Sequence, residues 1–194
     1  AQNGAYTGVT LANDSTGPFG TPAPFFDGAN DYVNIYSVAY DAAFNGSQGS
    51  AFAWAKVNGA GVWVDAVERY VFYISEDNNN FYSHGKNSVA NQLRYRMRCN
   101  AAFSAQTSAQ TATTWLHVGI TWFWDGANTT LTPYVNGAVA AVATTVAQQY
   151  VGNAGSGVSN VIGAASTIPG SVWHGWIGHP AVWDRVLPLP EIAT

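Results

Sequence analysis

The chain has 194 residues, of which only 9% are charged and 47% are hydrophobic, and its seven basic and eleven acidic side chains give a net charge of -4. This length suits one all-β domain with a sizeable core, and this charge balance provides no basic surface for nucleic acid or an anionic membrane. Cys99 is the only cysteine, which excludes an intrachain disulfide and a thiolate zinc site, and no apolar run is long enough to span a bilayer. We expect no nucleic-acid partner and no membrane insertion.

Short runs of β-branched and aromatic residues recur between clusters of Gly, Asn, Asp and Pro, a pattern typical of an all-β protein. Residues 1–24, which end in a turn-rich stretch, are expected to form an extended N-terminal arm and loop. The predicted strands that follow are residues 31–36, 51–57, 70–75, 92–99, 115–124, 130–135, 138–142, 160–163 and 175–183. Residues 38–46 are also compatible with a helix, and residues 188–194 with one short helical turn.

A tight hairpin is predicted where Asn136 and Gly137 separate two alternating runs in YVNGAV. Both residues tolerate the positive φ of a type I′ turn, so the runs on either side should pair as antiparallel neighbours. Many short antiparallel strands joined by turns indicate a two-sheet antiparallel jelly-roll sandwich. We predict an all-β fold of this kind, with residues 1–194 forming a single domain.

The stretch TWLHVGITWFWDG, residues 114–126, concentrates three tryptophans and a histidine. Side chains alternate along a strand, so one face carries Leu116, Val118, Ile120, Trp122 and Trp124, and this continuously apolar set is predicted to be core. The other face carries Trp115 and His117. Cys99 alternates with Leu93, Tyr95 and Met97 in the same way, which predicts a buried and unreactive thiol.

Four segments then carry a resemblance to a known family: FFDGANDYVNI (25–35), TWLHVGITW (114–122), YVNGAV (134–139) and WHGWIGHPAVWDRVLPLPEI (173–192). In order and spacing they resemble laminin-G-like domains of the concanavalin A-like lectin/glucanase superfamily, of the type found in bacterial secreted proteins and phage virion proteins. The resemblance implies two stacked sheets, with ligands held on a concave face or at loop edges. Trp115 and His117 match the family's Trp-x-His signature, which implies a structural role for both.

Catalytic groups are the next question, because glucanases of this architecture carry closely spaced paired carboxylates on one strand. The only glutamates are Glu68, Glu76 and Glu191, and the adjacent Glu76 and Asp77 would point to opposite faces of a strand. The chain also lacks a G-x-S-x-G elbow and an H-E-x-x-H motif. We therefore predict that the protein is not an enzyme.

Aromatic side chains are the first candidates for ligand binding, because a sugar stacks its apolar face on an exposed ring. Trp63, Trp173, Trp176 and Tyr82 lie near loops rich in Asn and Gly, and Trp63 and Trp173 are favoured because small or polar residues flank them. The alternative is that these rings fill the jelly-roll core.

A second candidate is the run LRYRMRC, which places Arg94, Arg96 and Arg98 on one face of a strand. Such a stripe would hold an acidic or sulfated glycan, or a negatively charged partner surface. The alternative is an ordinary solvated strand face.

Calcium is the metal that the resemblance implies, bound through carboxylates and backbone oxygens. Asp27 and Asp31 match positions where relatives keep acids. However, relatives often read Gly-x-Ile-Asp-Glu where this chain has Gly178 and His179 after Ile177, which removes two oxygen donors. The alternative is that both aspartates cap a turn.

Three functions remain after these exclusions. The first is a non-catalytic extracellular binding or adhesion module that recognises a glycan or a surface through a jelly-roll face. The second is a structural protein on a virion or cell surface, such as a capsid decoration or fibre module, whose partner is a capsid protein, a surface-layer protein or a second copy of itself. The third is a glycan hydrolase. The first two place the protein outside the cell or on a virion surface.

Overall fold

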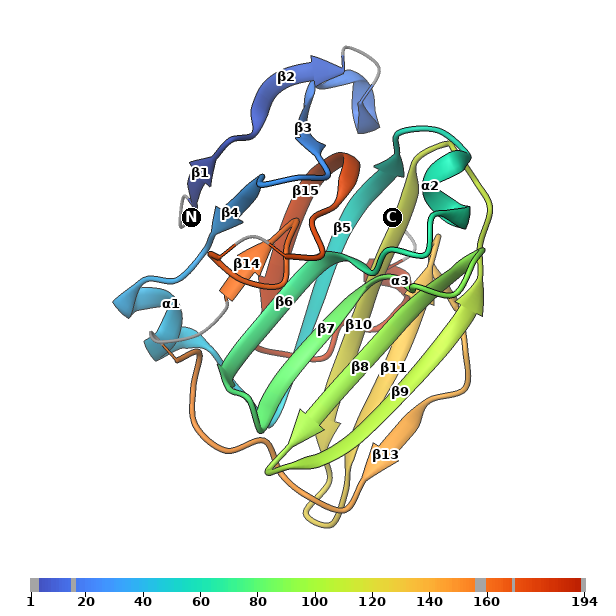
Figure 1. Ribbon diagram of the computed structural model, residues 1–194. Coiled ribbons are helices and arrows are strands. Elements are labelled where there is room, and N and C mark those ends of the chain that lie inside the picture. The colour runs from blue at the N-terminus through green and yellow to red at the C-terminus, as the bar shows by residue number, and fades with distance from the viewer. Residues whose placement is uncertain (1–3, 15–16, 156–159, 169, 193–194) are drawn as a thin grey trace.

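Two antiparallel β-sheets packed face to face form the protein, as the computed structural model in Figure 1 shows. The structure describes residues 4–14, 17–155, 160–168 and 170–192. This arrangement confirms the predicted two-sheet antiparallel sandwich. No helix in these ranges is long and apolar enough to cross a membrane.

The first sheet has seven strands. In spatial order these are β1 (Ala5–Thr7), β4 (Tyr32–Asn34), β14 (Asn160–Ile162), β6 (Arg69–Asp77), β7 (Asn80–Lys86), β8 (Gln92–Cys99) and β9 (Ala102–Ala109). Its long central strands run through the middle of Figure 1 in green.

The second sheet has eight strands. Seven follow the order β12 (Ala138–Val139), β11 (Thr129–Val135), β10 (Leu116–Trp124), β5 (Gln48–Val57), β15 (His174–Trp183), β3 (Ala23–Asp27) and β2 (Thr10–Asp14), and β13 (Thr144–Val146) also pairs with β11. The helices are short: the 3-10 turn η1 (Pro18–Gly20), α1 (Val38–Ala43), α2 (Gly61–Val64) and α3 (Leu189–Ile192).

Each predicted strand overlaps a strand of the structure, and α1 and α3 fall within the two stretches compatible with a helix. The pattern missed β3, β7, β9 and β13. All seven residues of β7 are buried, so its sequence lacks the alternation of polar and apolar residues that marks a strand with one exposed face. Strand β9 consists mostly of small residues with weak strand propensity. Within the described part of the N-terminal arm, β1 pairs with β4 and β2 pairs with β3, so the arm contributes an edge strand to each sheet.

The predicted hairpin is confirmed. Val135 pairs with Ala138 and Tyr134 with Val139, while Asn136 and Gly137 adopt φ angles of 49° and 77° between them. These positive angles are the ones that a type I′ turn requires, which explains why Asn and Gly occupy the two positions.

The core fills the space between the sheets and includes the face of β10 predicted to be apolar. Leu116, Val118, Ile120 and Trp122 are buried, while Trp124 at the strand end is only partly covered. Trp122 stacks on Tyr82 of the opposite sheet with their ring centres 4.6 Å apart, and its indole nitrogen donates to the carbonyl of Asn45. The tryptophan cluster is therefore mainly scaffold, and Cys99 is buried as predicted.

Candidate functional site

Three of the predicted aromatic ligand residues lie in the core, so their expected exposure is wrong. Trp63 and Trp173 are each 1% exposed and Tyr82 is 0% exposed. Their polar atoms donate to the backbone carbonyls of Ala112, Lys56 and Gly46 respectively. Proximity to a loop in sequence does not set the direction of a side chain, and each ring here has a buried carbonyl to satisfy its polar atom. None offers a free face to a sugar.

Trp176 is the one residue of that aromatic set with a partly exposed ring. It lies on β15, where the Lys56 ammonium sits 4.7 Å from the ring centre and the Phe25 ring packs 5.0 Å away. The same lysine also lies over Trp115, and His117 stacks on Trp54. These contacts belong to the outer face of the eight-stranded sheet, so Trp176 does not join the arginines.

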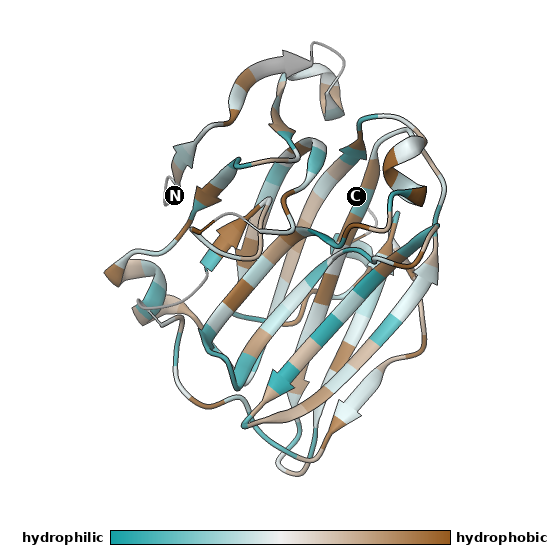
Figure 2. Ribbon diagram, in the orientation of Figure 1, coloured by the Kyte–Doolittle hydropathy of each residue, from teal (hydrophilic) through white to brown (hydrophobic). Residues whose placement is uncertain are grey.

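The three arginines of β8 share the outer face of the seven-stranded sheet. Between them Leu93, Tyr95, Met97 and Cys99 point into the core and are at most 1% exposed. This alternation appears in Figure 2 as teal and brown bands along β8. The register sets Arg94, Arg96 and Arg98 opposite Gly85, Ser83 and Phe81 of β7.

Aromatic rings from β6 and β7 lie beside these arginines. Tyr73 stacks on Phe81 with ring centres 5.3 Å apart, and Tyr70 meets Tyr73 edge to face at 5.4 Å. The Arg96 guanidinium carbon lies 4.8 Å from the Tyr70 ring centre, and its Nε donates to Ser83 Oγ at 3.3 Å. We call this set the arginine–tyrosine face: Glu68, Tyr70, Tyr73, Phe81, Ser83, Arg94, Arg96 and Arg98.

Glu68 organises one end of this face. Its carboxylate lies 3.1 Å from Arg94 and 3.5 Å from Arg96, and it accepts the Tyr70 hydroxyl at 2.9 Å. Arg98 instead donates to the backbone carbonyls of Asn78 and Ala101. Three guanidinium groups thus face one carboxylate within the set, so the face carries excess positive charge in a chain whose net charge is -4.

Burial changes the chemistry of this face only modestly. Desolvation lowers the pKa of Arg96, while nearby Glu68 acts to raise it, and a guanidinium stays charged at neutral pH. Burial also raises the pKa of Tyr73, which remains a neutral phenol. The arrangement offers fixed cations and the partly exposed ring of Tyr73 with its hydroxyl, while Tyr70, Phe81 and Ser83 are at most 8% exposed and support them from below. This suits recognition of an anionic, hydroxyl-rich ligand.

The sequence suggested the arginine stripe but missed Glu68, Tyr70, Ser83 and Phe81. Two of these lie on β7, a strand that the pattern did not predict, and their proximity to β8 depends on strand pairing. The alternating arginines of β8 were the local signal for an outer face, and β6 shows no such alternation.

The proposed calcium ligands satisfy the backbone instead. Asp31 is 3% exposed and accepts the Asp27 amide at 2.7 Å, while Asp27 accepts the amides of Ala29 and Asn30. A single Cβ added at Gly8 would lie 2.1 Å from Asp31 Oδ1, which shows how closely backbone packs against this oxygen. The described residues contain no group of three or more His, Cys, Asp or Glu side chains that could hold a metal ion. The two aspartates do not fit a calcium site and instead cap the turn.

The three glutamates have different surroundings. Glu68 is held by the arginines, Glu191 pairs with Arg185, and Glu76 lines a polar hollow of about 370 Å³ that also includes Asp41. Glu76 and Asp77 are neighbours on β6, so they do not face each other as the two carboxyl groups of a retaining glycosidase do.

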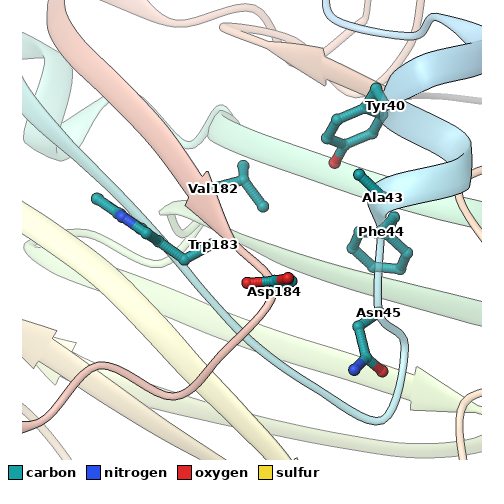
Figure 3. A pocket seen from close by; sticks show the side chains of 7 residues that line it. All are labelled: Tyr40, Ala43, Phe44, Asn45, Val182, Trp183 and Asp184. Carbon is teal, nitrogen blue, oxygen red and sulfur yellow. The ribbon is translucent and has the colours of Figure 1, made fainter. Parts of the chain in front are cut away.

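A separate cavity opens between α1 and the end of β15 (Figure 3). It has a volume of about 220 Å³ and is lined by Tyr40, Ala43, Phe44, Asn45, Val182, Trp183 and Asp184. It lies apart from the arginine–tyrosine face and shares no residue with it.

Comparison with solved structures finds the same fold in proteins with little sequence similarity. The binding domain of botulinum neurotoxin serotype D superposes with a TM-score of 0.64 at 13% identity, over 100% of this chain and 46% of that one. The CBM40 of the Ruminococcus gnavus IT-sialidase, bound to α2,3-sialyllactose, gives 0.57 at 13% identity, over 98% and 94%. Domains LG4-5 of the mouse laminin α1 chain give 0.55 at 11% identity, over 81% and 40%.

The chain therefore spans less than half the length of the neurotoxin domains, and these identities support a shared fold alone. A search of curated proteins found no significant match. The family model described as the concanavalin A-like lectin/glucanases superfamily matches residues 26–193, nearly the whole chain. The protein belongs to this superfamily, in agreement with the resemblance carried by its sequence motifs.

Proposed function

We propose that the protein is a non-catalytic extracellular recognition module that binds an acidic glycan on the arginine–tyrosine face. The observation that carries the proposal is the alignment of Arg94, Arg96 and Arg98 beside the stacked rings of Tyr73 and Phe81. Guanidinium groups hold carboxylate and sulfate oxygens through paired hydrogen bonds, and the partly exposed Tyr73 ring, backed by the buried Phe81, can accept the apolar face of a sugar.

Structural neighbours support this class of function. One is a carbohydrate-binding module bound to α2,3-sialyllactose, an acidic glycan, and others are receptor-binding domains of botulinum neurotoxins. Because the identities are 11% to 13%, the proposal depends on the charges and rings of this chain rather than on residues transferred from those proteins.

The test compares acidic and neutral glycans that share a core. Binding of the full chain to sialyllactose and to a sulfated lactose should exceed binding to lactose, and it should weaken as salt rises because the attraction is between exposed charges.

A broad glycan array, run with calcium and again with chelator, extends the same comparison. We expect equal binding in both conditions, because Asp27 and Asp31 are engaged by the backbone.

Variants connect binding to the proposed face. Arg94→Ala and Arg98→Ala should each weaken binding of the preferred acidic glycan about tenfold or more, since a charged hydrogen bond contributes about 1.5 to 3 kcal/mol. Arg185→Ala is the matched control, because Arg185 is exposed and pairs with Glu191 away from this face. Absence of acidic-glycan binding, or equal loss in the control, would instead favour the structural role with a protein partner on a particle or cell surface.

Hydrolysis is tested in the same samples. We expect sialyllactose and glucan oligomers to remain intact. Cleavage that disappears in Glu76→Gln would instead establish the glycan hydrolase, with Glu76 and Asp41 as the carboxyl groups that line one hollow.

A further inference from the structure

Helix α1 covers the side of the sandwich where the two sheets separate, and a second space lies under it. Beside the cavity of Figure 3 is a larger one of about 420 Å³, and the two share Tyr40, Ala43 and Val182 in their walls. The larger cavity reaches Phe72 and Ile162 of the seven-stranded sheet and Pro180 and Ala181 of the other sheet. Its remaining wall residues are Gly4, Ile35 and Ala39, so apart from the Tyr40 hydroxyl the side chains around it are apolar.

The Tyr40 hydroxyl is the unexplained group at this place. Its oxygen is buried and has no hydrogen-bond partner among the residues that the structure describes, although the ring edge is partly exposed. Figure 3 shows the hydroxyl directed into the space between α1 and Val182. A buried hydroxyl without a partner is costly, so a native protein normally supplies one from a ligand or an ordered water.

The mouth of the smaller cavity is polar. The Asp184 side chain is exposed and makes no hydrogen bond to any residue that the structure describes, and the Asn45 side chain stands opposite it across the opening (Figure 3). Neighbouring Arg185 is engaged by Glu191 at 2.5 Å, so its charge is already partnered. A head group that donates hydrogen bonds is therefore favoured over an anionic one.

Helix α1 itself is held by few contacts. None of its six residues is buried, and it is anchored by the Ser37 cap and by the packing of Tyr40 on Phe44. Both cavities are partly open to solvent, and an element with little buried apolar surface adjusts at low free-energy cost, so a ligand can reach the space behind α1.

We infer that the space under α1 binds a small amphiphile, with an apolar body between the sheets and a hydroxyl or amino head near Tyr40 and Asp184. The site goes beyond the proposed glycan recognition, because none of its lining residues belongs to the arginine–tyrosine face. Its size suits a compound of a few carbon atoms to about a dozen.

The test uses three probes with one apolar body: hexylamine, 1-hexanol and hexanoate. Each is added to the ¹⁵N-labelled chain at neutral pH. Amide shift changes should be confined to α1 and the walls of the two cavities, which are residues 38–45 and 181–184 together with Gly4, Ile35, Phe72 and Ile162. Hexylamine and 1-hexanol should bind several-fold more tightly than hexanoate. Tyr40→Phe removes an oxygen that bonds none of the described residues, and it should leave the fold intact. It is expected to weaken 1-hexanol binding about three- to tenfold.

A second pair of variants separates binding in the cavity from adsorption to the surface. Ala43→Phe places a ring where both cavities share a wall and should abolish the shifts, while Ala42→Phe adds the same ring on an exposed position of α1 that lines neither cavity. No shift with any probe at millimolar concentration, or equal binding by the two alanine variants, would overturn the inference and leave water as the partner of Tyr40. Arg94→Ala should not change probe binding, and Ala43→Phe should not change sialyllactose binding, so failure of one proposal is distinguishable from failure of the other.

Discussion

The Arg96 guanidinium carbon lies 4.8 Å from the centre of the Tyr70 ring, over the outer face of the seven-stranded sheet. The side chain is only 13% exposed and is also held by Ser83 and Glu68. Its position is therefore fixed before any ligand arrives, which lowers the entropy lost on binding.

This packing predicts that Arg96→Lys will not preserve function. Lysine keeps the charge but lacks the planar group that stacks on Tyr70 and forms paired hydrogen bonds. We expect affinity for the preferred acidic glycan to fall about fivefold or more, measured by titration calorimetry at fixed salt. The thermal midpoint should be recorded alongside, and unchanged affinity in a folded Arg96→Lys protein would contradict the role assigned to the guanidinium.

A buried ion network is the second feature with a measurable consequence. Lys86 is completely buried, and its ammonium lies 2.7 Å from Asp65, which also binds Arg69 at 2.6 Å. Burial acts to raise the pKa of Asp65, but the hydrogen bonds from Lys86 and Arg69 outweigh it and the pKa is lowered. Asp65→Asn leaves a buried ammonium without its counter-charge and should cost about 3 to 5 kcal/mol in urea unfolding at pH 7.

The control for that variant is the exposed pair between Arg185 and Glu191, whose side chains are each 48% exposed. Glu191→Gln should change the free energy of unfolding far less than Asp65→Asn does, because exposed ion pairs contribute little. Similar losses in the two variants would show that the burial of Lys86 is not what makes its ion pair important.

The buried His84 should make the free energy of unfolding depend on pH. Neither of its ring nitrogens has a partner among the described residues, and burial lowers its pKa to about 3. In the unfolded chain the pKa of His84 has its ordinary value near 6.5. As the pH falls below 6.5, the unfolded chain therefore binds a proton on this ring while the folded chain does not. The free energy of unfolding should therefore fall by up to about 1.4 kcal/mol per pH unit between pH 6 and pH 4 from this group alone.

Replacing His84 by Leu should flatten that slope. At pH 7 the variant should be at least as stable as the parent, because two buried polar atoms without partners are removed. His179→Asn is the matched control: His179 is exposed and adopts a φ of 48°, which Asn tolerates. An equally steep slope in His84→Leu would assign the acid sensitivity to other groups.

Because backbone amides occupy the carboxylates of Asp27 and Asp31, we expect calcium not to change the stability of the protein. Addition of millimolar calcium, or its removal by chelator, should leave the thermal midpoint within about 1 °C, since a ligand stabilises a protein only when it binds the folded state. Asp31→Asn should nevertheless destabilise the turn by about 1 to 3 kcal/mol, because the charged acceptor of the Asp27 N–H is replaced by a neutral amide. A midpoint that rises with calcium concentration would restore the metal site.

The local pattern alone predicted most of the longer strands. Alternation over 92–99 and 115–124 predicted β8 and β10 and their buried faces, because side chains of a strand point alternately to opposite sides whatever the rest of the chain does. Asn136 and Gly137 likewise determined their own turn through the positive φ angles that both accept. The low charge, the single cysteine and the four family motifs were also properties of the sequence by itself.

Tertiary structure decided which aromatic side chains are buried and which residues meet. Trp63 and Trp173 looked accessible beside polar neighbours, yet each lies in the core, because whether a side chain outside the regular strands is buried depends on segments far away in the chain. The meeting of Arg96 with Tyr70 requires β7 to lie between β6 and β8, and the space around Tyr40 requires α1 to close one side of two sheets. Strand order and sheet packing are set by long-range pairing and burial, and no local period of the sequence encodes them.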